Sequence, residues 1–232
     1  DLLDGRVLDC GDLELPIGNT EKALEAIEKM EEEILASGKF PFMLGGEHLV
    51  TLGAFRAVAR RYPEVCVIHF DAHADLRDEY LDVSLSHACV LRRCWELVGD
   101  ERIFQFGIRS GDREEFRWGK EHVRTRRFGF EGLEETLEQL KGRPVYFTLD
   151  LDVLDPSVFP GTGTPEPGGV SFEELRRAAE LVCRKADLVG CDVNELSPPY
   201  DPSGISTAAA CKIVREMLIA LQNKLGNCET SL

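Results

Sequence analysis

Three short clusters of acidic residues and histidines in this sequence each follow an apolar run, and they carry the residue types that bind metal ions. They read GGEH at 45–48, DAHAD at 71–75 and DLD at 150–152. Side chains two residues apart in extended backbone point the same way, so the alternate acids and histidines of a cluster converge on one side. The candidate metal ligands are His48, Asp71, His73, Asp75, Asp150 and Asp152.

The four carboxylates of this set would repel one another in a shared crevice unless cations compensated their charge. Carboxylate and imidazole ligands together suit Mn²⁺ or Fe²⁺, and they could also hold Zn²⁺ or Co²⁺. Two bridging carboxylates would fix two metal ions roughly 3.5–4 Å apart, so that the ions share one activated hydroxide. A lone Asp at a strand end is commonly a turn former or a helix cap. Three clusters at three strand ends indicate a metal site instead.

Two further residues, His87 and Glu195, could serve the same site, and two further histidines are expected elsewhere. His87 opens an expected helix, where it is either a simple cap or a proton shuttle beside the metals. Glu195 closes another apolar run, either as an ordinary strand-end acid or as a carboxylate that binds a cation across the same crevice. His69 lies inside an apolar run and is expected in the core or behind the ligands, whereas His122 lies in a charged stretch and is expected at the surface.

The elements that must position these residues alternate between short apolar runs and amphipathic segments. The expected strands cover 7–10, 41–44, 65–70, 103–106, 145–149 and 188–193, and the expected helices cover 21–36, 49–61, 87–98, 133–140, 172–185 and 206–221. Strands that are apolar throughout and alternate with helices predict a mainly parallel sheet in a three-layer α/β/α arrangement. Ligands bind beyond the carboxyl ends of the strands in such sheets, where the three clusters stand.

Composition narrows the class of protein. The 232 residues carry 27 Lys and Arg against 42 Asp and Glu, a net charge of −15, which disfavours a nucleic-acid partner. The apolar runs are far shorter than the roughly 20 residues of a membrane helix. Eight cysteines without a CxxC pair indicate a reduced, cytoplasmic protein. No linker divides the chain, so residues 1–232 are expected to form a single domain.

The motifs resemble the ureohydrolase family of arginases, agmatinases and related guanidino-hydrolases. The matching stretches are GGEH, DAHAD, SHA at 86–88, the run from 149 to 169 and DVNELSPPYD at 192–201, in the order of the family. The resemblance implies the arginase-like fold and two Mn²⁺ ions per subunit. It assigns one ion to His48, Asp71, Asp75 and Asp150, and the other to Asp71, His73, Asp150 and Asp152.

The same resemblance implies the reaction. A hydroxide between the metals would attack a guanidinium carbon, oriented by Asp75, while Glu195 pairs with the guanidinium group and His87 shuttles protons. The loop from 160 to 169 would form a wall of the pocket. The family also suggests a homo-oligomer, a trimer or hexamer, and it generally has a further N-terminal strand and loop that this chain is expected to lack.

The segment from 76 to 86 favours agmatine, cleaved to putrescine and urea in polyamine biosynthesis, as the substrate. It reads LRDEYLDVSLS, without the Ser/Asn-rich loop by which arginases recognise an α-amino acid. Asp78, Glu79 and Asp82 either favour a second positive charge on the substrate or form a solvated acidic loop. The alternatives are guanidinobutyrate, aminopropylagmatine or arginine as substrate, a non-catalytic metal- or polyamine-binding homologue, and a metal phosphoesterase.

Overall fold

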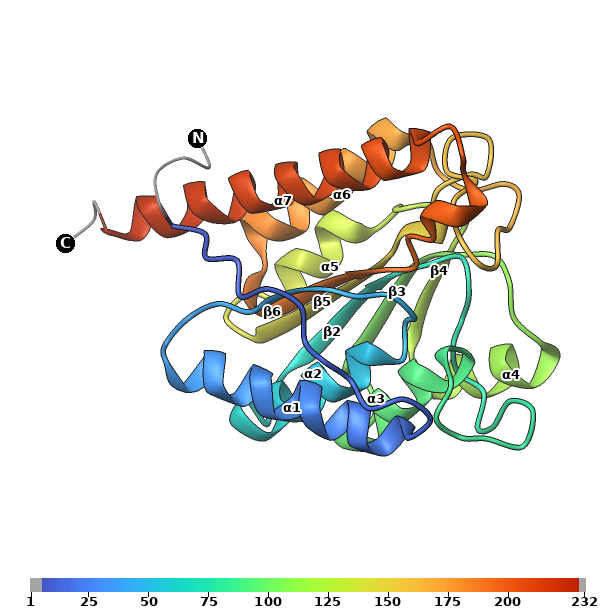
Figure 1. The fold of residues 1–232 in the computed structure, drawn as a ribbon, viewed down its shortest axis with the longest axis horizontal. Helices are drawn as coiled ribbons and strands as arrows, with labels where there is room; N and C mark the ends of the chain where they lie inside the picture. Colours follow the sequence, from blue (N-terminus) through green and yellow to red (C-terminus); the bar gives the residue numbers. More distant parts are fainter. Residues whose placement is uncertain (1–5, 230–232) are drawn as a thin grey trace.

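The computed structural model describes residues 6–229, which are built around one sheet of six strands (Figure 1). The strands are β1 (Phe42–Leu44), β2 (Cys66–Phe70), β3 (Ile103–Ile108), β4 (Arg124–Arg127), β5 (Pro144–Asp150) and β6 (Asp187–Asn194). They lie in the order β1-β6-β5-β2-β3-β4, and every neighbouring pair is parallel. The predicted parallel sheet is confirmed.

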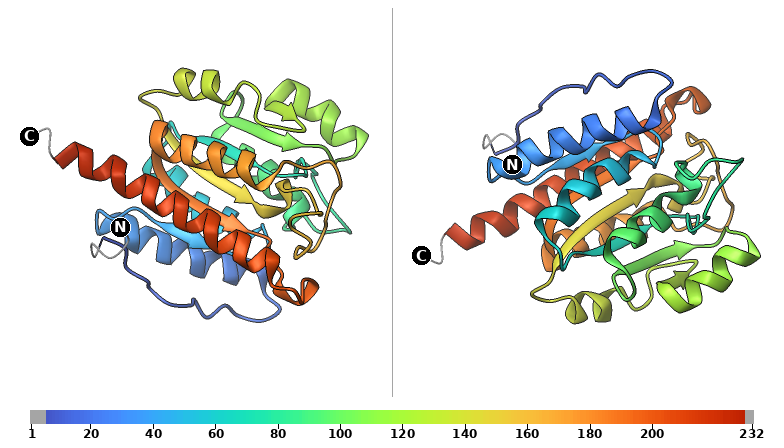
Figure 2. Two further views of the ribbon diagram at one scale, coloured as in Figure 1. Left: turned by 90° about the horizontal axis from the view of Figure 1, so that it is seen from above. Right: turned by 90° about the horizontal axis from the view of Figure 1, so that it is seen from below.

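Helices cover both faces of the sheet. They are α1 (Thr20–Ala36), α2 (Val50–Arg61), α3 (Val90–Val98), α4 (Arg113–His122), α5 (Leu133–Gln139), α6 (Phe172–Lys185) and α7 (Ile205–Glu229). Helices α5, α6 and α7 form one layer, and α1, α2 and α3 lie on the opposite face (Figures 1 and 2). This is the three-layer α/β/α arrangement that the sequence predicts.

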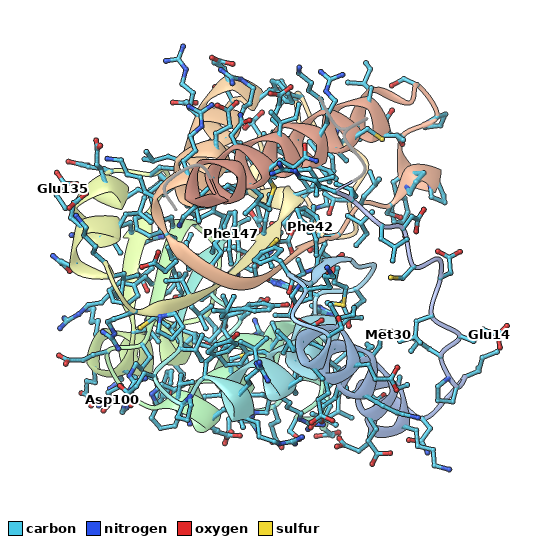
Figure 3. The ribbon with its side chains drawn as sticks, turned by 90° about the vertical axis from the view of Figure 1, so that its left-hand side faces the viewer. Glu14, Met30, Phe42, Asp100, Glu135 and Phe147 are labelled. Carbon is cyan, nitrogen blue, oxygen red and sulfur yellow. The ribbon has the colours of Figure 1, made fainter. Side chains whose placement is uncertain are left out.

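Successive residues of the central strands enter different cores, because side chains alternate across a sheet. Ile68 and Phe147 pack in the core under α6 and α7, whereas Val67 and Tyr146 pack in the core under α1, α2 and α3. Figure 3 shows Phe147 inside the molecule, with Asp100 and Glu135 at the periphery. Two-sided burial explains why these strands are apolar throughout.

The carboxyl edge of the sheet has its reversal point between β2 and β5. From β2 the chain continues through β3 to β4 on one side, and from β5 it continues to β6 on the other. The connections therefore diverge where β2 and β5 meet, which is where open parallel sheets bind ligands. The segments that follow these two strands carry DAHAD and DLD.

One expected element is absent, and two observed elements were not expected. Residues 7–10 form no strand, and Leu8 is 84% exposed, because no neighbouring strand offers them backbone partners. Strand β4 is unexpected because its sequence RTRR is charged; it lies at the sheet edge, where β3 supplies its pairing. Helix α4 is also unexpected, since it is mostly polar, and it begins with a capping box formed by Asp112 and Glu115.

The remaining expected elements agree with the structure to within a few residues at each end, apart from α7, which continues to Glu229. The helix expected over 87–98 is divided into a 3₁₀ turn at His87–Cys89 and α3. None of the helices within residues 6–229 is both long enough and apolar enough to cross a membrane.

Candidate metal centre and active site

The metal-ligand candidates meet at the reversal point, and three of the four carboxylates also accept backbone hydrogen bonds. Asp71 Oδ1 accepts the His73 backbone N–H at 2.5 Å, and Asp150 Oδ1 accepts that of Asp152 at 2.8 Å. Asp152 Oδ1 accepts the Ala72 N–H at 3.1 Å, which ties the two clusters together. One oxygen of each of these three carboxylates thus stabilises the backbone of the site.

His48 Nδ1 lies among three carboxylates. Its distances to the Oδ2 atoms of Asp71, Asp75 and Asp150 are 3.2, 3.1 and 3.3 Å. His73 Nδ1 forms a second centre, 2.9 Å from Asp152 Oδ2 and 3.4 Å from Asp71 Oδ1. Asp71 belongs to both centres. The structure therefore brings together all six ligand candidates that the sequence singled out.

Burial makes this concentration of acids costly without cations. Desolvation and the neighbouring acids raise the pKa of Asp75 to about 7 and that of Asp150 well above its usual range. Burial alone would lower the pKa of His48, but the surrounding carboxylates hold it well above its usual value. Each effect has the sign expected where positive charge is required.

Two buried atoms of the cluster have no hydrogen-bond partner among the described residues, although charged groups surround both. They are His48 Nδ1 and Asp152 Oδ2. Buried polar atoms are otherwise nearly always satisfied. Unsatisfied nitrogen and oxygen donors that face one another match what a divalent ion takes as ligands, so the residues present fit a metal centre.

Residues behind the ligands fix their orientation, and the sequence reading missed two of them. His48 Nε2 lies 2.9 Å from Thr148 Oγ1, which donates to Asp192 Oδ1 at 2.6 Å. His69 Nε2 lies 2.8 Å from Asp71 Oδ2, and Gln105 Nε2 donates to His69 Nδ1 at 3.1 Å. Gln105 also binds the Ala74 carbonyl, so His69 is held behind the ligands as expected.

A signal for the missed residues does exist in the sequence. Thr148 shares the strand face of Asp150, two positions away, and Gln105 is a polar residue inside the apolar strand IFQFGI. A polar side chain buried in an apolar strand must have a partner, and here the partner is a histidine of the centre.

Glu195 lies beside His48, the histidine of the first ligand centre. Its Oε1 accepts the His48 backbone N–H at 2.7 Å, and its own N–H donates to the Gly46 carbonyl at 2.8 Å. Its φ of 66° is left-handed, which is uncommon for a residue with a side chain and frequent at functional sites. A Cβ on Gly163 would lie 3.8 Å from Glu195 Oε2, so the loop from 160 to 169 approaches this carboxylate.

That loop is held by Arg109, which the sequence reading did not single out. The guanidinium donates to the carbonyl oxygens of Asp152 at 2.8 Å, Val153 at 3.2 Å, Leu154 at 3.3 Å and Glu166 at 2.7 Å. Arg109 therefore joins the turn that carries a metal-ligand candidate to the loop that faces Glu195.

His87 and Glu47 form a half-exposed pair at the same edge. Glu47 Oε1 accepts the His87 backbone N–H at 2.8 Å and lies 2.9 Å from His87 Nδ1. The hydrogen bond with Glu47 raises the pKa of His87, while partial burial opposes it. The first turn of α3 approaches the site because Leu91 N–H donates to the Asp75 carbonyl at 3.1 Å.

The acidic loop between 76 and 86 is partly neutralised. Asp78 accepts a hydrogen bond from Arg93 at 2.6 Å, and Arg93 also pairs with Glu96. Glu79 and Asp82 are exposed. His122, expected at the surface, stacks on Trp118 at 4.2 Å and pairs with Asp100.

Comparisons with known proteins agree with one another. A family model described as Arginase family matches residues 1–220. The chain is 45% identical to an agmatinase of Bacillus anthracis over 94% of this chain and 77% of that one, and 35% identical to a guanidinobutyrase of Pseudomonas aeruginosa over 93% and 71%. The crystal structure of an agmatine ureohydrolase of Thermoplasma volcanium is 36% identical, covers 94% of this chain and 74% of that one, and superposes with a TM-score of 0.83.

Proposed function

This chain belongs to the arginase family and is a ureohydrolase, and we propose that it hydrolyses agmatine to putrescine and urea with two Mn²⁺ ions per subunit. The observation that carries the proposal is the convergence of six Asp and His ligands beside a separate carboxylate, Glu195, that could take a cationic substrate. A metal phosphoesterase would have no need of that carboxylate.

Each metal ion would be held by one set of four ligands, and the two sets would share Asp71 and Asp150. One consists of His48, Asp71, Asp75 and Asp150, and the other of Asp71, His73, Asp150 and Asp152. When bound, the two ions compensate the buried carboxylates and supply a strong nucleophile at neutral pH by lowering the pKa of water. His69 is assigned behind this shell, because its ring is already engaged by Asp71 and Gln105.

Glu195 would hold the substrate. A guanidinium is planar and can form a forked pair with a carboxylate, which fixes the position of its central carbon. The N–H of His48 fixes Glu195 Oε1, so the substrate would be placed relative to a metal ligand by a single backbone bond. Asp75 would orient the attacking water, and its buried carboxyl lies 3.1 Å from His48 Nδ1.

His87 would move the proton that the departing amine requires. Guanidinium hydrolysis releases a poor leaving group unless it is protonated, and imidazole is the side chain best suited to transfer that proton near neutral pH. The ring is half-exposed, so it can exchange protons with solvent. The atoms balance: one water and one agmatine give one urea and one putrescine.

The charge around the mouth supports agmatine over guanidinobutyrate. The carboxylate of guanidinobutyrate needs a cation, and the nearby arginines are engaged: Arg77 with Glu115 and Arg93 with Asp78. Glu79 and Asp82, which are exposed in the same segment, would favour the second positive charge of agmatine.

Urea release from agmatine, guanidinobutyrate, aminopropylagmatine and arginine, measured on the Mn²⁺-loaded protein, tests the choice of substrate. We expect the highest kcat/KM with agmatine; a clear preference for arginine would contradict the assignment. Metal binding without turnover on any of the four would identify a non-catalytic homologue. The trimeric or hexameric assembly and the cytoplasmic location stay predictions, and the first can be checked by light scattering.

A further inference from the structure

Glu47, the third residue of the GGEH motif, makes two close contacts with His87. One carboxylate oxygen, Oε1, lies 2.8 Å from the backbone nitrogen of His87 and 2.9 Å from its ring atom Nδ1. The two residues are 40 positions apart, so the fold, not local sequence, creates the pair. We propose that Glu47 is a positioning residue that fixes the orientation and the tautomer of His87, an inference that rests on the proton-transfer role of His87 in the proposed function.

The tautomer follows from the chemistry of the two partners. An ionised carboxylate can only accept hydrogen bonds, so Nδ1 of His87 carries the proton in this pair. In the neutral ring, Nε2 is then the nitrogen that can take a proton, and its direction is set once Nδ1 is held. The same oxygen contacts both the ring and the backbone of His87. Rotation of the ring would therefore break its contact with Glu47.

The ring is also bounded on another side. Tyr80 packs edge-on against it with the centroids 5.9 Å apart, and the Arg77 guanidinium lies 4.8 Å from the Tyr80 centroid. The charged groups that act on His87 are Glu47, Asp75 and Glu195, and all three favour the protonated ring, against partial burial. Of these, Glu47 is the one in hydrogen-bond contact.

Glu47 is itself held in place. Its Oε2 accepts the Leu49 backbone N–H at 3.0 Å, at the start of α2. Its other oxygen, Oε1, is the one that contacts His87, so both carboxylate oxygens are engaged. The adjacent residue, His48, holds Glu195. Two neighbouring residues of one loop would thus position both the proton carrier and the substrate carboxylate.

A competing explanation is that Glu47 only shapes its loop. A double-mutant cycle separates the two, because a residue that acts through His87 has little left to do when the imidazole is absent. The variants are Glu47→Gln, His87→Ala and the combination of both. Asp100→Asn is the matched control: Asp100 pairs with His122 Nδ1 at 2.7 Å in a second carboxylate–imidazole pair outside the ligand cluster.

The experiment compares kcat and KM for agmatine in Mn²⁺-loaded proteins of equal metal content. We expect Glu47→Gln to lower kcat about tenfold or more with little change in KM, since general acid–base steps are commonly worth about 10²–10⁴. In the His87→Ala background the same change should cost less than about twofold, and Asp100→Asn should match the wild type. An equal loss in both backgrounds, or wild-type kcat in Glu47→Gln, would overturn the inference.

A readout independent of turnover separates this inference from the proposed function. In Zn²⁺-loaded protein, ¹⁵N chemical shifts of the His87 ring should report the Nδ1–H tautomer in the wild type. In Glu47→Gln the ring should titrate at lower pH, because the ionised partner has been lost. Unchanged ring shifts and titration would overturn the positioning role even if agmatine is cleaved. If the wild type releases no urea but the shifts change as expected, the proposed function fails and the positioning role stands.

Discussion

The backbone N–H of His48 donates a 2.7 Å hydrogen bond to Glu195 Oε1 across a separation of 147 residues. The first residue follows β1 and the second follows β6, and these strands are neighbours in the sheet. The Glu195 N–H in turn donates to the Gly46 carbonyl, so the two loops are joined by two hydrogen bonds. In the proposed mechanism, this bond ties the carboxylate that would bind substrate to the backbone of a metal-ligand candidate.

At Gly45 this arrangement leaves no room for a side chain. A Cβ there would lie 2.0 Å from Asn194 Oδ1 and 2.8 Å from Val50 Cγ2. The Asn194 side chain, whose Nδ2 donates to Thr51 and Asp192, would have to move. We expect Gly45→Ala to cost about 1–3 kcal/mol in unfolding free energy and to reduce Mn²⁺ content. Gly46→Ala is the control, because its Cβ would meet no atom within 4 Å. Chemical denaturation and metal analysis compare the two; equal effects would contradict the steric argument.

Glu195→Gln should separate substrate binding from metal binding. The substitution keeps an oxygen for the His48 N–H but removes the charge that pairs with a guanidinium. Hydrogen bonds to charged groups are worth about 1.5–3 kcal/mol, so kcat/KM for agmatine should fall roughly ten- to hundredfold. Metal content, read by atomic absorption, should stay at the wild-type level. Loss of metal in this variant would instead assign Glu195 to the metal shell.

His87→Ala and Asp150→Ala should fail for different reasons. Removal of the His87 imidazole should lower kcat about 10²–10⁴-fold while Mn²⁺ content is retained. Removal of the Asp150 carboxylate should release metal, because this group lies in the first ligand centre, 3.3 Å from His48 Nδ1. Metal analysis and urea release on the same samples decide; equal metal loss in both variants would contradict the assigned roles.

Glu31, which lies in α1 outside the ligand cluster, makes the free energy of unfolding depend on pH. It is buried in α1, and desolvation together with Asp192 raises its pKa to about 8 from the usual 4.5. The folded state therefore keeps a proton that the unfolded state loses above pH 4.5. This contribution to stability is complete at low pH and is lost as the pH rises towards 8, by a few kcal/mol, since one pH unit is about 1.4 kcal/mol.

Glu31→Gln should flatten this dependence, because the amide does not ionise. Urea denaturation at pH 5.5 and 8.5, with metal loading held constant, should show a smaller loss of unfolding free energy in the variant than in the wild type. Glu25→Gln, on the exposed side of the same helix, is the control and should behave as the wild type does. Parallel pH profiles for all three proteins would exclude Glu31 as the source.

The sequence predicts the central strands and the ligand clusters for the same physical reason. Strands such as Cys66–Phe70 are apolar because helices cover both faces, and the acids after them stand out against that background. The charged edge strand Arg124–Arg127 gives no such signal, since its stability comes from pairing with β3. The opposite error occurs at residues 7–10, where an apolar run predicts a strand but the structure has none, because no partner strand is present.

The contacts of the site that could not be predicted from the sequence join residues far apart in the chain. The parity of Asp71, His73 and Asp75 is local, so it can be read from the chain. The pairing of Glu47 with His87 and the clamp of Arg109 on four carbonyls depend on loops brought together by the sheet. No spacing rule connects positions 47 and 87, and a polar residue in a loop is ordinarily only solvated.

Stoichiometric product analysis of the reconstituted enzyme tests the central claim most directly. Protein stripped with a chelator and reloaded with Mn²⁺ should bind two ions per chain and convert agmatine to urea and putrescine in equal amounts, whereas the stripped protein should release neither. Two bound ions without urea from agmatine, or urea from the metal-free chain, would contradict the account.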